Sequence, residues 1–304
     1  MKRFFTILCV FCMAMLTACT DIRTRKYADV MIVQSGADYH AAMRCSDADT
    51  WFSAVSESCV GLHDALECAV GADIGTGHLA LVMLQGDSLA PLREWYAAGL
   101  LAPTCPVLLC ADDINAKKLA DTNISARLEL AFQNGYLPCI TVGDVLGNIK
   151  SRAAMTILPY FADGMLTLAV HDGSQICGIC SADACRGAAL LGGQFDAFML
   201  SKIQGNTGEI AQIRSCRNKI TCGVSDSGMS LTVNIKIRTD TKNFNTAAQI
   251  AQQDVTAFFD EAVTKFGADT CFLEESANRC RIEIPAADAW RKMLRSAHVY
   301  VIVS

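Results

Sequence analysis

The sequence lacks the short motifs that mark the commonest catalytic sites. It contains no glycine-rich phosphate loop, no Gly-x-Ser-x-Gly nucleophile elbow and no His-Glu-x-x-His helix. It also lacks an excess of basic charge, with 26 Lys and Arg against 31 Asp and Glu. An acidic chain suits neither nucleic acid nor anionic lipid headgroups. The sequence therefore gives no support to catalysis, and we expect no cofactor and no nucleic-acid partner.

Long hydrophobic runs are also scarce. One lies at the N-terminus, where the mainly apolar stretch from Phe4 to Ala18 follows Lys2 and Arg3. This run has about 15 residues, whereas a helix that spans a bilayer needs roughly 20. A basic start, a short apolar run and small residues at its end are typical of an export signal, and a permanent transmembrane helix is the weaker alternative. The next candidate, 79–84, has the length of a strand.

The end of this signal resembles the lipobox of bacterial lipoproteins, with Leu16, Thr17, Ala18 and Cys19 in order. The resemblance implies that 1–18 is a signal peptide, that Cys19 receives a diacylglycerol, and that 19–26 is a lipidated tether. Two acyl chains hold a protein firmly, because each buried CH₂ adds about 0.8 kcal/mol. The alternative is an ordinary signal peptide in which Cys19 is incidental. We expect a water-soluble body held at an extracytoplasmic membrane face.

Removal of the signal leaves 286 of the 304 residues, with 24 basic and 31 acidic side chains and a net charge near −7. This length predicts two or three domains.

Cysteine is unusually frequent, with 16 residues. Apart from Cys9, Cys12 and Cys19 the body carries thirteen, an odd number, so at least one has no internal disulfide partner. Several occupy apolar positions of strand-like runs, as Cys110 and Cys271 do, where a free thiol behaves as a small hydrophobe. An exported chain in an oxidising compartment normally pairs its cysteines. We therefore hypothesise an anaerobic source in which these thiols stay reduced.

The first part of the body, 27–150, has the pattern of an α/β domain. Strands are expected at 27–33, 40–45, 77–84 and 107–110, and helices at 62–70 (ended by Gly71), 89–96 (capped by Ser88), 112–121 and 124–133. The order strand, helix of about three turns, strand across 77–110 predicts a βαβ unit with a parallel pair of strands.

A smaller middle unit, 151–200, is expected to contain a hairpin and a helix. Runs at 165–170 and 175–179 flank Asp172 and Gly173, a dipeptide that favours a tight turn. The stretch 181–191 then reads as a helix that ends at Gly192.

The C-terminal unit, 201–304, has the clearest alternation. Leu231, Val233, Ile235 and Ile237 alternate with polar residues, which places one face of a strand in a core. The expected neighbours are a strand at 210–222, a final strand at 298–303, and a helix from an N-cap at 245 or 246 to Gly267. The fold class is therefore mixed α/β and α+β, with a long helix on a mostly antiparallel C-terminal sheet.

The spacing of Cys177 and Cys180, with Cys185 nearby, is that of a redox motif or half a zinc site. A redox motif belongs between a strand and a helix, whereas this pair straddles the expected hairpin. A zinc site needs four converging ligands, and no second pair stands out. We interpret the three as structural thiols and keep them as weak metal candidates, so no metal is expected.

The order of features resembles the Ger(x)C spore germination lipoproteins, the C subunits of nutrient germinant receptors. The similar pieces are the lipobox with Asp21-Ile22-Arg23, the strands 27–33 and 77–82, the hairpin 168–179, the paired strands within 210–237, the helix to Phe266-Gly267-Ala268-Asp269, Pro285 with Trp290, and the closing strand. They span nearly the whole mature chain in the family's order.

The resemblance implies a non-catalytic, three-domain subunit on the outer surface of the spore inner membrane. It implies assembly with two membrane-spanning partners, a large A subunit and a transporter-like B subunit, to transmit amino-acid, sugar or nucleoside signals. Cys19, which joins the protein to the bilayer, is the one functional residue that it assigns. The alternatives are a lipid-anchored solute-binding protein of a transporter, and a tethered thiol oxidoreductase that uses Cys177 and Cys180.

Overall fold

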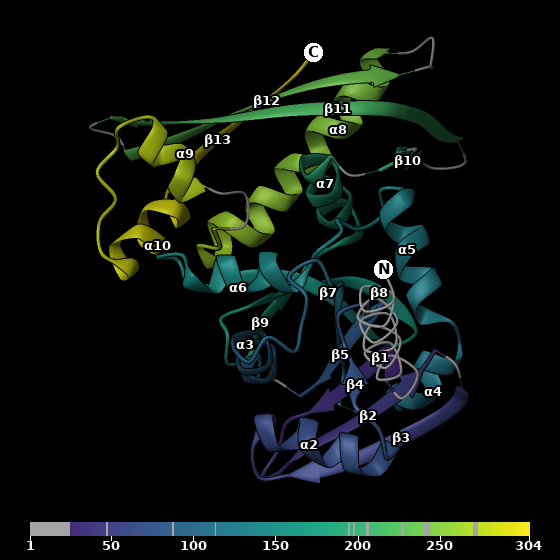
Figure 1. Ribbon diagram of the computed structural model, residues 1–304. Coiled ribbons are helices and arrows are strands. Elements are labelled where there is room, and N and C mark those ends of the chain that lie inside the picture. Colours follow the sequence, from purple (N-terminus) through teal and green to yellow (C-terminus); the bar gives the residue numbers. More distant parts are fainter. Residues whose placement is uncertain are drawn as a thin grey trace, which may run out of the picture.

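The strands of the protein form two sheets that lie at opposite ends of the molecule (Figure 1). The computed structural model describes residues 25–46, 48–86, 88–112, 114–193, 195–196, 198–204, 207–225, 228–239, 244–269 and 273–304. Three helices lie between the sheets, namely α6 (Val142–Lys150), α7 (Ala182–Gly192) and α8 (Phe244–Phe258). The predicted signal peptide, Cys19 and all but the end of the predicted tether lie outside the described residues.

The larger sheet has nine strands in the order β3-β2-β1-β5-β6-β7-β8-β9, with β4 beside β1. Their bounds are β1 Lys26–Gln34, β2 Tyr39–Cys45, β3 Ala48–Ser56, β4 Ile74–Gly75, β5 Leu81–Gln85, β6 Val107–Cys110, β7 Thr156–Ala162, β8 Met165–His171 and β9 Ile176–Ile179. The central strands β1, β5, β6 and β7 are parallel, and antiparallel hairpins flank them. The expected parallel pair is confirmed as β5 and β6, which α3 (Ala90–Ala97) connects.

Four helices accompany the first part of this sheet: α2 (Cys59–Val70), α3, α4 (Ala116–Asp121) and α5 (Ile124–Gln133). Gly71 ends α2 in the left-handed conformation, as expected. Two predicted starts were wrong. Ser88 lies one residue before the N-cap of α3, although its Oγ accepts the Ala90 N–H, and α4 begins only at Ala116, where Asn115 is the cap.

The middle segment continues the larger sheet. β7 pairs with β6 and β8 pairs with β9, so the predicted hairpin is confirmed as an extension of the first sheet. The hairpin turn forms because Asp172 Oδ1 accepts the N–H groups of Ser174 and Gln175. The helix α7 that follows begins at the N-cap Ser181, as expected. The division into domains at 150 and 200 stays a prediction.

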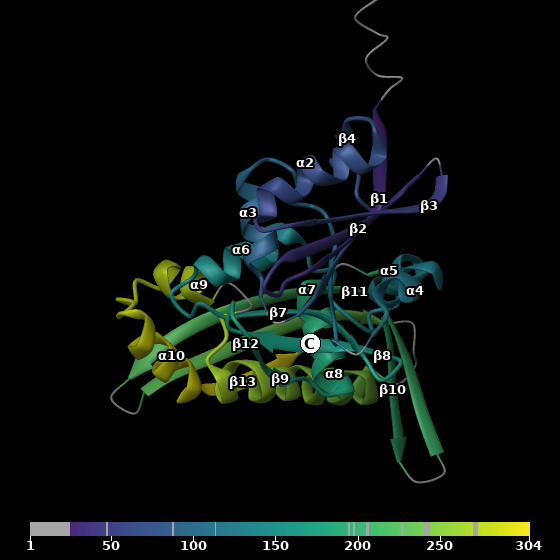
Figure 2. The same ribbon diagram turned by 90° about the horizontal axis from the view of Figure 1, so that it is seen from below.

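The smaller sheet has the order β10-β11-β12-β13, antiparallel except for the parallel pair β12 and β13. Its strands are β10 Phe198–Gln204, β11 Thr207–Ser225, β12 Gly228–Thr239 and β13 His298–Val303, and the short helices α9 (Leu273–Arg279) and α10 (Ala287–Arg295) precede β13. Figures 1 and 2 show α8 along the face of this sheet that points toward the rest of the molecule. This arrangement confirms the predicted fold class.

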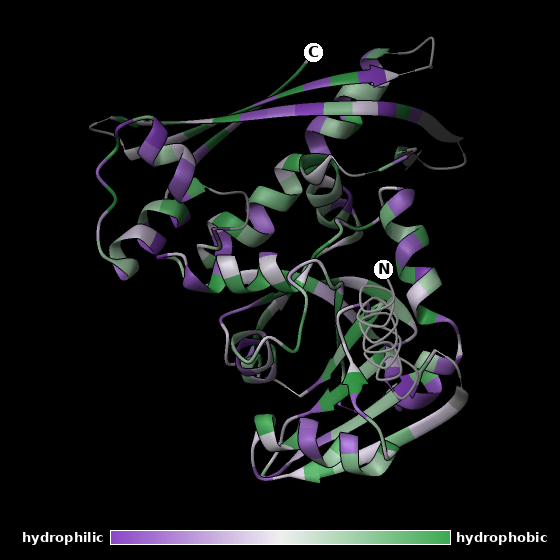
Figure 3. Ribbon diagram, in the orientation of Figure 1, coloured by the Kyte–Doolittle hydropathy of each residue, from purple (hydrophilic) through white to green (hydrophobic). Residues whose placement is uncertain are grey.

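The apolar positions that the alternation identified are all buried. Leu231, Val233, Ile235 and Ile237 point from β12 toward α8, and Figure 3 shows the same concentration of hydrophobic residues in the central strands of the larger sheet. The predicted N-cap of α8 was wrong, because the helix already includes Phe244. Among the described helices, none is both long and apolar enough to span a bilayer.

Candidate functional site

A cavity of about 390 Å³ lies between the two sheets, among the helices that separate them (Figure 1). Its apolar wall comes from the segment before α6, from β7, from α7, from β11 and from α8; the residues are Ile140, Ile157, Leu191, Ile220 and Phe258. Small-molecule sites in proteins have volumes of roughly 300–1,000 Å³. The cavity is therefore large enough for a small metabolite, and it is built by segments far apart in the sequence.

The polar groups of the cavity are few. Asp144 belongs to the capping box of α6, in which one carboxyl oxygen accepts both the N–H and the Oγ–H of Thr141. Its other oxygen has no hydrogen-bond partner among the described residues, and it can accept a hydrogen bond from a bound molecule. Asn148 donates to Thr156 Oγ1 over 3.4 Å. Burial, followed by the charge of Asp144, raises the pKa of the Cys139 thiol, which disfavours the nucleophilic thiolate.

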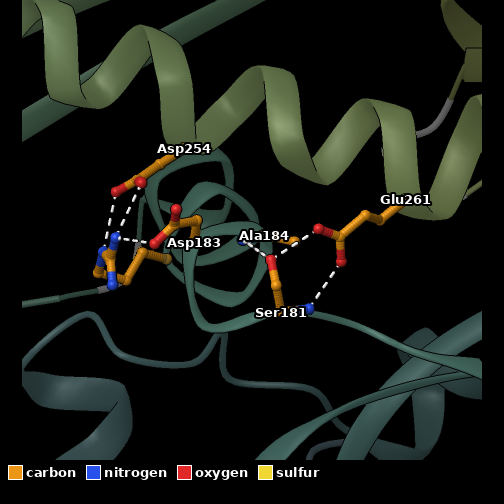
Figure 4. A network of polar contacts seen from close by, with 6 residues as sticks. Ser181, Asp183, Ala184, Asp254 and Glu261 are labelled. Atoms are coloured by element: carbon orange, nitrogen blue, oxygen red, sulfur yellow. Dashed lines mark hydrogen bonds and ion pairs between the residues drawn. The ribbon is translucent and has the colours of Figure 1, made fainter.

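The helix α7 that lines one side of the cavity is joined to α8 and to the π-helix η2 (Phe259–Thr264) that continues it (Figure 4). At its N-terminus, the Glu261 carboxylate accepts the backbone N–H and the Oγ–H of Ser181 over 2.6 and 2.7 Å. One turn later, the Arg186 guanidinium donates two hydrogen bonds of 2.9 Å to Asp254. Next to Arg186 the two helices come close at Gly187, where an added Cβ would overlap the Asp254 carbonyl oxygen.

A buried aspartate organises the segment after α8. Asp269 accepts the N–H groups of Leu273 and Glu274 at the start of α9, and the Trp290 indole N–H over 3.3 Å. Burial raises the pKa of Asp269, while these three donors oppose the rise. The Asp269 and Trp290 positions that carried part of the family resemblance therefore meet in the folded protein, where they hold α9 and α10 together.

The three cysteines considered as weak metal candidates lie in or directly after β9 and on α7. Cys177 is in β9, Cys180 follows this strand, and Cys185 is on α7. Burial raises the pKa of Cys180 to about 12 and also raises the pKa values of Cys177 and Cys185. Catalytic redox pairs depend on a lowered thiol pKa. The twelve described cysteines form no disulfide with one another, and Cys271 lies outside the described residues.

One cluster of possible metal ligands occurs in the described part of the chain, and sequence reasoning missed it. His63, Asp64 and Glu67 on α2 have ligand atoms within 4.8 Å of one another. His63 Nε2 is buried without a hydrogen-bond partner and lies 3.9 Å from Glu67 Oε1, which accepts the Ile74 N–H. The i, i+4 spacing of His63 and Glu67 is the signal that was available in the sequence.

The outward face of the smaller sheet is basic although the chain is acidic. Among the described side chains that strand register places on this face of β11, β12 and β13, none is an acid. Four are cations, namely Arg217 and Lys219 on β11 and Lys236 and Arg238 on β12, and all four are exposed. The alternation of basic residues along both strands was the available signal.

The fold of this chain is similar to that of a solved structure. The crystal structure of the GerBC protein superposes with a TM-score of 0.50 at 12% sequence identity, and the match covers 88% of this chain and 92% of that one. No protein-family model and no curated protein sequence matches the chain. At this identity the likeness is one of fold, and it confirms the expected Ger(x)C-like architecture.

Proposed function

We propose that the protein is a non-catalytic, lipid-anchored subunit of a spore nutrient-germinant receptor, of the C-subunit type. In this role Cys19 carries the diacylglycerol, and the body stands on the outer surface of the spore inner membrane. It assembles there with a large membrane-spanning A subunit and a transporter-like B subunit. The body transmits their nutrient signal and does no chemistry of its own.

The observation that carries the proposal is the extent of the fold shared with GerBC. The match covers 88% of this chain and 92% of that one, so it extends beyond either sheet alone. The sequence features that resemble the Ger(x)C family occur in the family's order along the same length. Two of them, Asp269 and Trp290, contact each other in the buried junction of α9 and α10, which gives these positions a structural role.

The lipid anchor is central to this proposal because it raises the effective concentration of the body beside its membrane partners. We expect a Cys19→Ala variant to fold normally and to lose most nutrient-triggered germination when it is the sole copy in spores. Cys68→Ala, which removes an exposed cysteine of α2, is the matched control and should germinate normally. Full germination by the Cys19→Ala spores would contradict the anchor role.

Two further observations test the receptor assignment itself. Genes for a spanning A subunit and a transporter-like B subunit should lie beside the gene for this chain. Spores that lack the protein should respond poorly to at least one amino acid, sugar or nucleoside. Normal responses to every nutrient would argue against the receptor role.

A second candidate, a lipid-anchored solute-binding protein, is favoured by the cavity at the junction of the sheets. Such proteins close two similar lobes around their ligand, whereas the two sheets here differ in strand number and connection. Calorimetry of the purified body against amino acids, sugars and nucleosides separates the two candidates. Tight binding of one metabolite, lost on Ala189→Trp in the cavity wall, would favour the solute-binding role.

A further inference from the structure

The edge strand β13 of the smaller sheet is open on one side. It pairs with β12 alone, and no described strand lies beyond it. Natural proteins protect long edges with charged residues, proline or bulges, because an open edge is a template for pairing. The described sequence of β13, His298–Val303, contains none of these devices. Tyr300 and Ile302 are 57% and 51% exposed on its outward face, whereas Val301 is buried.

The backbone of β13 presents its free groups at alternate residues. Ser304 N–H donates to the Ile235 carbonyl, and Ser304 O accepts the Ile237 N–H, so Ser304 faces β12. Because successive residues of a strand point to opposite sides, Tyr300 and Ile302 also direct their backbone groups toward β12. Val299, Val301 and Val303 therefore direct their N–H and C=O groups away from the sheet.

This alternation restricts how a second copy of β13 can pair. In an antiparallel pair, the residues that exchange hydrogen bonds must both point across the interface. A two-fold axis at Val301 satisfies this condition for Val301 with its copy and for Val299 with Val303 of the other chain, which makes about six hydrogen bonds. Only a shift by two residues keeps the outward-facing backbone groups of the two chains opposite each other, and such a shift loses at least one of these pairs.

The same register covers the exposed apolar side chains. It places Tyr300 of each chain opposite Ile302 of the other, in a non-hydrogen-bonded pair where the Cβ atoms are about 4.5–5.5 Å apart. Aromatic and β-branched residues are favourable partners at such positions. The strand is thus self-complementary in both its backbone groups and its outward side chains.

Charge also permits this pairing. β13 contains no charged side chain apart from His298 when it is protonated, and its neighbours on β12, Thr232 and Asn234, are neutral. The basic residues of the two chains would be separated by three strand spacings, about 14 Å, on β12 and by five, about 24 Å, on β11. Both separations exceed the Debye length of about 8 Å at physiological ionic strength, so the repulsion is screened.

We infer that two copies of this protein associate through antiparallel pairing of their β13 strands, which joins the two smaller sheets into one. The contact is small, so the dimer is weak and depends on concentration. Two copies anchored on one membrane would meet at a raised effective concentration. The inference does not depend on the receptor role, because its test uses the body without the acyl anchor.

The first test is sedimentation equilibrium of residues 19–304 with Cys19→Ala, which retains every described strand and helix. We expect the average mass to rise from monomer toward dimer between about 5 and about 500 µM, the range of a weak interface. Ile302→Lys should weaken the dimer at least about tenfold. Val224→Lys is the matched control, because Val224 is 54% exposed on β11 of the same sheet and should leave the dimer intact.

A second substitution separates association from folding. Val301→Pro removes an N–H that faces away from β12, a position where an edge strand tolerates proline. It should abolish the dimer while the melting temperature of the monomer stays close to that of the parent. A body that remains monomeric over the whole range, or a dimer that Val301→Pro and Ile302→Lys leave unchanged, would overturn the inference.

The register is tested by cross-linking. In a mixture of Tyr300→Cys and Ile302→Cys bodies, oxidation should link residue 300 of one chain to residue 302 of the other, identified by mass spectrometry of the joined peptides. Each variant alone should link more slowly, because its thiols would be diagonal neighbours about 7–8 Å apart. Equal rates for the mixture and for either variant alone would overturn the register. If the body stays monomeric and spores with Ile302→Lys nevertheless fail to germinate, the strand that pairs with β13 belongs to another protein.

Discussion

Arg186 on α7 and Asp254 on α8 form a bidentate ion pair at the junction of the two sheets. Nε and Nη2 of Arg186 donate to the two carboxyl oxygens of Asp254, each over 2.9 Å. Nη2 also donates to Asp183 in the first turn of α7. The Asp254 side chain is 3% exposed, so the pair is nearly excluded from water. It fixes the helix that follows the larger sheet against the helix that covers the smaller one.

Removal of the cation from this pair should be strongly destabilising. We expect Arg186→Met to lower the free energy of unfolding by about 3 kcal/mol, because it leaves a buried carboxyl without its partner. Arg186→Met combined with Asp254→Leu should be milder, because neither charge then remains buried. The control Arg279→Met breaks an exposed pair with Glu275 and should cost less than about 1 kcal/mol. Urea unfolding measures all three; an equal loss for Arg186→Met and Arg279→Met would contradict the buried pair.

The same pair predicts a dependence of stability on pH. Burial raises the pKa of Asp254 to about 6; Arg186 opposes this shift, and Asp183 adds to it. Between about pH 4 and about pH 6 the folded protein therefore binds a proton that the unfolded chain does not, so this group stabilises less as the pH rises. Relative to Asp254→Asn, the free energy of unfolding of the parent should fall by about 2 kcal/mol between pH 4 and pH 7. A difference of the opposite sign in urea unfolding at the two pH values would mean that Arg186 lowers this pKa.

Two glycine substitutions should have effects of opposite sign. Gly187→Ala should destabilise by about 1–3 kcal/mol, because its Cβ would overlap the backbone of α8 at Asp254 and Val255. Gly147→Ala on α6 should stabilise by about 0.5–1 kcal/mol, because nothing lies within 4 Å of the added Cβ and alanine favours a helix. Thermal unfolding of the two variants measures both effects. Stabilisation by Gly187→Ala would contradict the close approach of α7 and α8.

Thiol reactivity should follow burial. Cys68 and Cys280 are exposed and should react within minutes with a thiol reagent in the native, unreduced protein. Burial raises the pKa values of Cys105 and Cys110 to about 12, so these thiols should react only after unfolding. Peptide mapping after timed labelling distinguishes the sites. If most body cysteines stay blocked even after unfolding without reductant, the hypothesis of reduced thiols fails.

Local patterns predicted many of the elements because the signal for each lies within a short stretch. The alternation around Leu231 identified β12, and the turn residues Asp172 and Gly173 identified the hairpin of β8 and β9. Elements with weak periodicity were missed. β3 is a half-exposed edge strand, α6 contains Gly143 and Gly147, and β7 contains Pro159. For α6 a usable signal was present in the capping box of Thr141.

The candidate site could not be predicted in the same way. The wall of the cavity combines Ile140, Ile157, Leu191, Ile220 and Phe258, which come from five segments spread over more than a third of the chain. No local pattern records which of these segments meet. The basic outward face is an intermediate case. Alternation places its cations on one face, but only strand register shows that no acid joins them among the described side chains.

The sequence by itself determined the positions of the periodic strands and helices and the side of each that is buried, and it predicts an export signal with a lipobox. These properties depend on residues a few positions apart. Only the tertiary structure decided that β7, β8 and β9 extend the first sheet, that α7 locks onto α8, and that β13 ends the second sheet with an open edge. Such pairings depend on the packing of surfaces that are distant in the sequence. Their free energy therefore cannot be read from any single segment.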